Sequence, residues 1–270
     1  MLILYGDYLL EPHMELGIGS IITLFSNFGL SDQAVRSAVS RMCRSNLLKV
    51  RSEGRKSYYS LTDYGHSLLR TGAQRVFVRK DTEWDGYWNI VTYSIPEDNR
   101  KTRDILRREL DWMGYGGLCG ATMISPYDLS REVTELAEKL GIADCVNIFR
   151  ANQIGNSDAR KIVSSCWDLN KIHVMYAEFL EQYEPMYVEF LKRIQSGEEI
   201  PSGEYFSERF MLIHDYRRLP YFDPDLPEQL LPKGWLRPRA TKLFNDYQEL
   251  LAVKAREYFN LVLSDYEAGR

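Results

Sequence analysis

Apolar and polar residues follow two different spacings in the first seventy residues of the chain. Apolar residues that recur every three or four positions predict helices, whereas two short strand-like stretches on either side of a turn with Gly54 predict a hairpin. The expected elements are helices at residues 2–10, 19–28, 32–46 and 62–69 and strands at residues 47–51 and 56–61. Two helices around a tight turn, followed by a hairpin, are the order of a winged helix-turn-helix.

The helix expected at residues 32–46 has two chemically different faces, and Ser31 is its expected N-terminal cap and also a candidate DNA contact. One face is apolar and is expected to be core; it carries Val35, Ala38, Val39 and Met42. At about 100° per residue, the other face is polar and carries Gln33, Ser37, Ser40 and Arg44, with Arg36 and Arg41 beside them. Arginine donates two hydrogen bonds to guanine, glutamine pairs with adenine, and small serines allow close approach to the major groove. The polar face is therefore predicted to read DNA.

Basic charge is concentrated in the same segment. Residues 31–62 hold seven Lys or Arg and two Asp or Glu, an excess of +5, so the rest of the chain carries −9 of the net charge of −4. The hairpin side chains suited to follow the phosphate backbone or reach a minor groove are Arg51, Arg55, Lys56 and Tyr58. A solvated helix or an ordinary hairpin is the simpler interpretation of either piece alone. Their adjacency and shared charge favour double-stranded DNA as the partner.

Beyond residue 84, which follows a charged and irregular stretch, the pattern predicts two further domains. The order up to residue 151 is close to β-α-β-β-α-β with one strand missed or split, which is typical of a ferredoxin-like domain. Its expected elements are strands at residues 87–95, 118–125 and 145–151 and helices at residues 99–113 and 128–140. The last part is helical, at residues 167–183 with a continuation to 194 that Pro185 opens or kinks, 205–219 and 238–265. A non-helical connector with five prolines is expected at residues 220–238.

The predicted fold class is α+β, in three domains. These are an N-terminal winged helix-turn-helix domain at residues 1–80, a central ferredoxin-like α/β domain at residues 84–155 and an α-helical C-terminal domain at residues 160–270. The chain has no run of about 18 apolar residues and no secretory leader, so we expect no membrane partner. The four cysteines form no CxxC pair, which favours a reducing environment. We therefore expect a soluble, cytoplasmic protein.

The chain offers few residues for catalysis. None of its histidines, His13, His66, His173 and His214, is spaced as a metal ligand with another histidine or a cysteine. The glycine-rich stretch at residues 114–120 follows a helix, and Cys119 stands where a dinucleotide loop needs its last glycine, so we expect a helix stop and a tight turn. We expect no catalytic residues, no metal and no cofactor.

Motifs in all three parts, in order, resemble the PaaX family, which are repressors of phenylacetic acid catabolism. The motifs of the first part are LFS at 24–26, GLS at 29–31, AVRSAVSRM at 34–42, EGRKSYY at 53–59 and LT at 61–62. Those of the middle are WDG at 84–86 with Trp88, SIPE at 94–97, LR at 106–107 and ISP at 124–126. Those of the last part are HDYRR at 214–218, DPDLP at 223–227 and LLP at 230–232 before Trp235.

The resemblance implies a homodimeric repressor that leaves its operator when a coenzyme A thioester, phenylacetyl-CoA in the best-known members, binds outside the DNA module. The family's central domain is similar in fold to small CRISPR-associated nucleases, which place a metal-binding aspartate at the end of the first strand. Ser94 stands there in this chain, so metal-dependent cleavage is not expected. Two alternatives stay open: a nucleic-acid-processing enzyme with a nuclease-type domain, and a winged-helix interaction protein that does not bind DNA.

The candidate effector residues are His214, Tyr216, Arg217, Arg218 and Trp235. Guanidinium groups suit the phosphates of an acyl-CoA, and the aromatic side chains, with Tyr221 and Phe222 nearby, suit an aromatic acyl group. A structural salt-bridge cluster explains the two arginines equally well. For His214, which lies on an apolar helix, a buried histidine bonded to a neighbour is the simpler interpretation.

Overall fold

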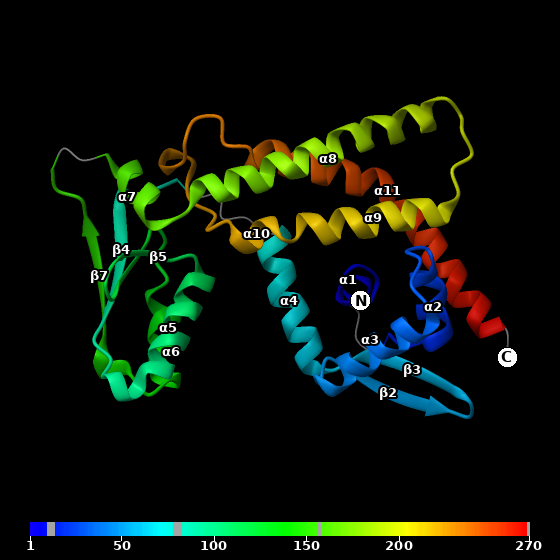
Figure 1. Ribbon diagram of the computed structural model, residues 1–270, viewed down its shortest axis with the longest axis horizontal. Coiled ribbons are helices and arrows are strands. Elements are labelled where there is room, and N and C mark those ends of the chain that lie inside the picture. Colours follow the sequence, from blue (N-terminus) through cyan, green and yellow to red (C-terminus); the bar gives the residue numbers. More distant parts are fainter. Residues whose placement is uncertain (10–13, 78–82, 156–157, 269–270) are drawn as a thin grey trace. The chain divides into compact units, whose positions relative to one another are not determined.

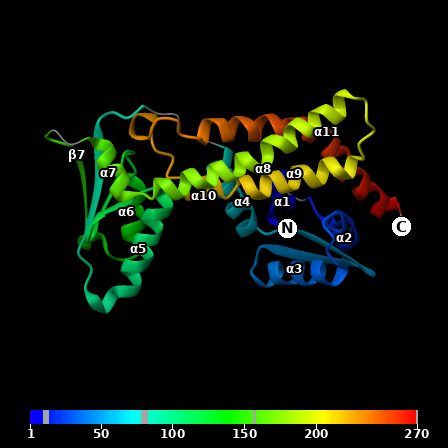
Figure 2. The ribbon, with the colours of Figure 1, turned by 45° about the horizontal axis from the view of Figure 1, so that its top comes forward.

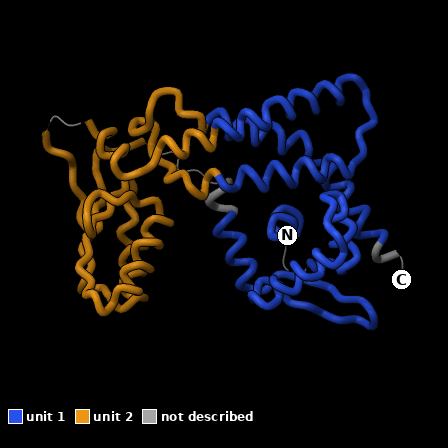
Figure 3. The backbone as a smooth tube through the Cα atoms, viewed as in Figure 1, with its two compact units in different colours: residues 1–78, 177–218, 238–270 blue, residues 79–176, 219–237 orange. Residues whose placement is uncertain are grey.

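The computed structural model describes residues 1–9, 14–77, 83–155 and 158–268. The chain forms two compact units (Figure 3). Unit 1 consists of Met1–Val78, Ala177–Arg218 and Pro238–Arg270, and unit 2 of Arg79–Tyr176 and Leu219–Arg237. Among the described residues, every helix is too short or too polar to span a lipid bilayer.

The first part of unit 1 has the helices and the hairpin that the sequence predicts (Figure 1). Its elements are α1 (Leu2–Tyr8), β1 (Leu16–Gly17), α2 (Ile18–Ser26), α3 (Asp32–Arg44), β2 (Leu48–Glu53), β3 (Lys56–Leu61) and α4 (Asp63–Phe77). The antiparallel sheet has the order β1-β3-β2. The two-residue strand β1 was not predicted, and α4 runs further than residue 69. The winged helix-turn-helix prediction is confirmed.

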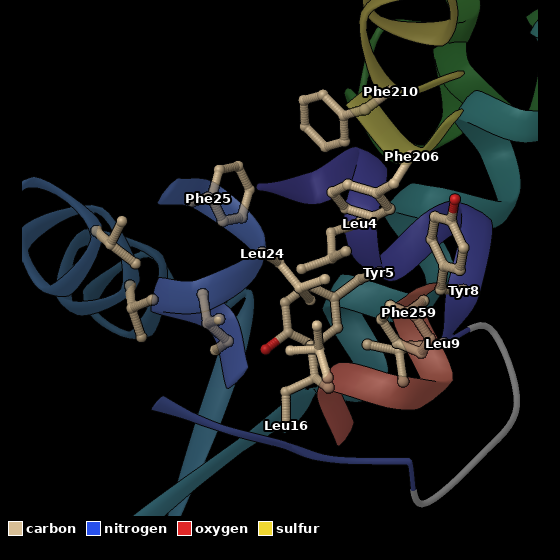
Figure 4. Packing of buried hydrophobic residues seen from close by; sticks show 14 of the residues in the cluster. Leu4, Tyr5, Tyr8, Leu9, Leu16, Leu24, Phe25, Phe206, Phe210 and Phe259 are labelled. Atoms are coloured by element: carbon tan, nitrogen blue, oxygen red, sulfur yellow. The ribbon is translucent and has the colours of Figure 1, made fainter. Parts of the chain in front are cut away.

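Helices from the far end of the chain complete the core of this first part. Unit 1 also contains most of α8 (Leu169–Gln195), α9 (Ser202–Tyr216) and nearly all of α11 (Arg237–Ala268). One buried cluster, which includes Val39 of α3, joins side chains of α1, α2 and α3 to side chains of α9 and α11. Figure 4 shows Leu4, Phe25, Phe206 and Phe259 in this cluster. The domain boundaries at residues 1–80, 84–155 and 160–270 therefore stay a prediction. Among the residues that the structure describes, the first segment does not have a core of its own, because it shares one with parts of the last segment.

Charged side chains also attach α1 to the C-terminal helices. Arg209 on α9 donates two hydrogen bonds of 2.8 Å to the carboxylate of Asp7, and both side chains are largely buried. Arg256 on α11 donates to the backbone carbonyls of Asp7 and Tyr8, at 2.9 and 3.1 Å. We call Asp7, Arg209 and Arg256 the α1 clamp, which adds directional bonds to the shared apolar core.

Unit 2 is built on a four-stranded antiparallel sheet of order β5-β6-β4-β7. Its first elements are β4 (Tyr87–Tyr93), α5 (Arg100–Met113), β5 (Gly116–Cys119), β6 (Thr122–Ser125), α6 (Ser130–Lys139) and β7 (Val146–Asn152). The single strand expected at residues 118–125 is two strands around Gly120, whose φ is +51°. The resulting β-α-β-β-α-β order confirms the ferredoxin-like central domain.

Helices α5 and α6 lie next to each other against the sheet (Figure 2). Val91 and Met123 of the sheet, Leu106 and Leu110 of α5 and Val133 of α6 share one buried cluster. The glycine-rich stretch after α5 ends the helix at Gly114, which has a φ of +96°, and then enters β5. The structure therefore has both the helix stop and the tight turn that were predicted, with the turn at Gly120, although strand β5 lies between them.

The remaining elements of unit 2 are short and were only partly expected. They are α7 (Ala159–Cys166), which was missed, α10 (Leu219–Phe222) and the 3₁₀ turns η1 (Glu97–Asn99), η2 (Ala143–Cys145) and η3 (Glu228–Leu230). Apart from α10 and η3, the proline-rich connector is non-helical, as predicted. Its Asp223 is buried and accepts a 2.6 Å hydrogen bond from Tyr176 on α8, while Arg237 forms an ion pair with the same carboxylate.

Candidate nucleic-acid interface

Helices α2 and α3 are held at a tight turn. Gly29 has a φ of +69°, a conformation that glycine adopts without strain, and it follows the end of α2. The hydroxyl of Ser31 accepts a hydrogen bond from the backbone N–H of Ala34 at 3.3 Å, so Ser31 caps α3 as predicted. Its side chain therefore already has a partner within the protein.

The two faces of α3 are separated as the sequence predicts. Val35, Val39 and Met42 are buried against α2 and the rest of the core, and Ala38 is half-buried. The predicted reading residues are all exposed: Gln33, Arg36, Ser37, Ser40, Arg41 and Arg44. In the part of the chain that the structure describes, none of the three arginines forms an ion pair. Their charges are thus uncompensated by direct contacts, which suits a helix that binds a polyanion.

The hairpin β2–β3 turns at Gly54, with a φ of +59°, and carries the predicted basic residues with different surroundings. Arg55 is exposed and has no ion pair among the described residues, whereas Lys56 is half-buried opposite Glu53. These positions make the hairpin a basic wing beside α3.

Arg51 and Tyr58 have clear roles inside the module. Arg51 forms ion pairs with Glu15 and Glu53, and its guanidinium lies 4.7 Å from the ring centroid of Tyr58. Hydrogen bonds to Glu15, and to a smaller extent to Glu53, raise the pKa of Arg51. Arg51 is therefore charged, but these two carboxylates balance its charge. Tyr58 is buried. DNA contact by these two residues stays a prediction. Glu15 was missed because it lies outside the periodic segments.

Four of the five predicted effector residues belong to unit 1, and their surroundings differ. Tyr216 is buried, with its ring stacked on Phe244 at 3.8 Å and its hydroxyl 2.9 Å from that of Thr241. His214 is half-buried, and burial, followed by the charge of Arg217, lowers its pKa. Arg217 and Arg218 are exposed, with no ion pair among the described residues. A salt-bridge cluster is thus absent from this part of the structure.

Trp235, the fifth predicted effector residue, belongs to unit 2. Its ring lies 5.6 Å from His173 and 6.1 Å from Tyr176, and among the described residues its buried indole N–H has no acceptor. The hydroxyl of Tyr176 in turn donates the hydrogen bond to the buried carboxylate of Asp223 described above. This network was not predicted, because its members are separated along the chain and the DPDLP motif is its one local sign in the sequence.

Ser94 follows directly after β4, and its backbone N–H bonds to the carbonyl of Cys145 at 2.9 Å. In the described ranges, no group of three His, Cys, Asp or Glu side chains is arranged to hold a metal ion. His13 lies outside the described residues.

Family models match the chain in three consecutive segments. Residues 1–65 match "PaaX-like protein", residues 81–163 match "PaaX protein central Cas2-like domain", and residues 167–261 match "PaaX-like protein C-terminal domain". The transcriptional repressor PaaX of Escherichia coli strain K12 is 33% identical over 251 residues, which cover 92% of this chain and 78% of that protein.

A solved structure has the same fold over most of its length. Uncharacterized protein Rv0674 from Mycobacterium tuberculosis matches with a TM-score of 0.58 and 21% identity, over 89% of this chain and 90% of that one. At this identity the likeness concerns the fold alone.

Proposed function

Because the chain belongs to the PaaX family of transcriptional repressors, we propose that it binds a double-stranded DNA operator through α3 and the β2–β3 wing. The observation that carries the proposal is the exposed face of α3, where Arg36, Arg41 and Arg44 have no ion pair among the described residues. Arginine forks in the major groove select guanine, at about 1–3 kcal/mol for each good pair, and the wing supplies charge for phosphates.

The regulated genes, in this proposal, are those of aromatic acid catabolism of the phenylacetate type. An aryl-acyl-CoA, of which phenylacetyl-CoA is the model, releases the repressor from its operator. The exposed Arg217 and Arg218 support this effector class because guanidinium groups bind phosphates. Release follows from linkage: a ligand that binds more tightly to the conformation unfit for DNA weakens DNA binding to the same extent.

The active species is proposed to be a homodimer. A single winged helix covers a short site, and two reading helices spaced one turn of DNA apart multiply a modest affinity. The dimer also gives the ligand a simple means of control, because a change in the spacing of the two readers is enough to weaken the complex.

Fluorescence anisotropy tests the proposal directly. The full-length protein is titrated onto labelled duplex from upstream of its own gene, at several salt concentrations, and then with phenylacetyl-CoA or free phenylacetate. We expect salt-sensitive binding that the thioester releases and the free acid does not. Arg41→Gln and Arg44→Gln are expected to weaken binding, each by roughly five- to a hundredfold.

A matched variant keeps this test specific. Arg70 is an exposed arginine on α4 of the same module, outside the predicted interface and without an ion pair among the described residues. Arg70→Gln removes the same charge and is expected to change affinity much less than Arg41→Gln. Equal effects of the two changes, or no preference for the upstream duplex over random DNA, would refute the assignment of α3 as the reader.

A further inference from the structure

Unit 2 carries three aromatic side chains next to one another at its surface. The ring of Trp112 on α5 lies 4.5 Å from that of Tyr221, with the planes at 65°, and Tyr221 lies 5.9 Å from Phe222. Tyr221 and Phe222 are 56% and 49% exposed, although burial is what usually stabilises rings of this size. We call Trp112, Tyr221 and Phe222 the aromatic platform. A cluster of three rings, of which Tyr221 and Phe222 are exposed and Trp112 is half-buried, indicates a contact surface for a ligand.

Cations stand beside this platform. The ammonium of Lys171 on α8 lies 5.4 Å from the ring centroid of Phe222. Arg108 precedes Trp112 by four residues on α5, which places the two side chains next to each other on the helix surface. Both basic residues are exposed, and neither has an ion pair within the described ranges. They are therefore able to bind phosphate oxygens next to a ring stacked on the platform.

Among the described residues, Phe149, another exposed phenylalanine of unit 2, lacks the neighbouring rings and cations of the aromatic platform. Phe149 on the edge strand β7 is 52% exposed. In the described part of the chain it has neither a ring contact nor a cation over its face. The platform differs from it in combining three rings with two flanking positive charges.

We propose that the aromatic platform binds an adenine nucleotide, with the base stacked on Tyr221 and in edge contact with Phe222, whose ring plane is turned by 67°, and with the phosphates at Lys171 and Arg108. Stacking on aromatic side chains with nearby cations is how proteins bind a base and its phosphate. The nucleotide is either free or the nucleotide half of a coenzyme A thioester. In the second case the proposal deepens, and rests on, the effector part of the proposed function, and it assigns the nucleotide phosphates to Lys171 and Arg108 of unit 2 in place of Arg217 and Arg218.

Isothermal titration calorimetry of the full-length protein with ADP, and separately with coenzyme A, measures the affinity for each nucleotide in the absence of DNA and so tests the proposal. Phe222→Ala and Tyr221→Ala are each expected to weaken binding about tenfold, the effect of losing one aromatic contact to the base. Phe222→Tyr keeps the ring and is expected to retain the affinity. Lys171→Gln is expected to weaken binding and to make it less sensitive to salt.

Matched controls are available in the same unit. Phe149→Ala removes an equally exposed ring, and Lys139→Gln removes an exposed charge at the end of α6. Both are expected to leave the affinity unchanged. A circular dichroism spectrum of each variant shows that it is folded.

The outcomes separate the two sources of the nucleotide. Loss of affinity for both ADP and coenzyme A in Phe222→Ala supports a general nucleotide site, and loss for coenzyme A alone supports an acyl-CoA site. No detectable binding of either probe, or equal affinities of Phe222→Ala and Phe149→Ala, overturns the proposal. Operator binding in the absence of ligand is measured independently, so a failure of the DNA assignment is seen separately.

Discussion

Replacing Arg209 by methionine breaks the α1 clamp at its most buried point. The guanidinium donates two 2.8 Å hydrogen bonds to Asp7 and a further one to the backbone carbonyl of Gln248. The side chains of Arg209 and Asp7 are only 12% and 15% exposed, so the variant leaves a carboxylate that is poorly reached by water. Breaking a buried pair in this way costs about 3–5 kcal/mol, and the residual exposure favours the lower end, about 3 kcal/mol.

For a unit of this size, 1 kcal/mol shifts the melting temperature by about 2–4 °C, so Arg209→Met is expected to lower it by about 6–12 °C. Thermal unfolding followed by circular dichroism measures this shift. The double variant with Asp7→Asn is expected to be more stable than the sum of the two single changes implies, because it leaves no unpaired charge.

An exposed pair in the same unit provides the control. Arg239 and Glu184 also form two hydrogen bonds, both of 2.6 Å, but their side chains are 62% and 36% exposed. Arg239→Met is therefore expected to cost no more than about 1 kcal/mol. If Arg209→Met and Arg239→Met shift the melting temperature equally, burial does not determine the strength of the clamp and the reasoning is wrong.

Two further predictions concern unit 1. A Cβ on Gly65 would lie 2.3 Å from the carbonyl oxygen of Leu47, so Gly65→Ala is expected to destabilise the protein by about 1–3 kcal/mol in urea unfolding. Gly72→Ala, on the same helix with nothing within 4 Å, is expected to stabilise it by about 0.5–1 kcal/mol, and the same sign for both would contradict the contact. Burial, reinforced by the charge of Glu204, raises the pKa of Glu208 in the folded protein. The folded protein therefore loses stability as the pH rises above the pKa that Glu208 has in the unfolded chain. Glu208→Gln is therefore expected to raise the melting temperature at pH 7.5 and to change it little at pH 4; an equal change at both would show that ionisation is not the cause.

Local patterns predicted the parts of the fold that depend on neighbours in sequence. Helix α3 has a cap at Ser31 and an apolar face at helical spacing, and both signals lie within a few residues of it. Strand β1 has only two residues and exists because Leu16 pairs with Tyr59, which no local pattern reveals. The strand at residues 118–125 divides at Gly120, whose positive φ gives the turn that the continuous apolar pattern hid.

The candidate interface shows the same division. The exposed face of α3 follows directly from helical periodicity, whereas the pairing of Arg51 with Glu15 depends on how a strand meets a distant loop. The core that the N-terminal segment shares with α9 and α11 is the largest feature that the sequence patterns did not predict. Phe206 and Phe259 pack with Leu4 and Phe25 across most of the chain length, and such contacts are set by tertiary structure alone.

The shared core also sets the order in which the protein is able to mature on the ribosome. Helix α3, the proposed DNA reader, is made early, but Phe206, Phe210, Phe259 and Val262, which close its core, are made last. Until α9 and α11 have been made, the core around Leu4, Tyr5 and Leu24 is incomplete. The partly made N-terminal segment is therefore expected to expose apolar side chains and to be prone to aggregation. Operator recognition therefore becomes available only after nearly the whole chain has been translated, and shortened products of the gene are not expected to compete for the operator.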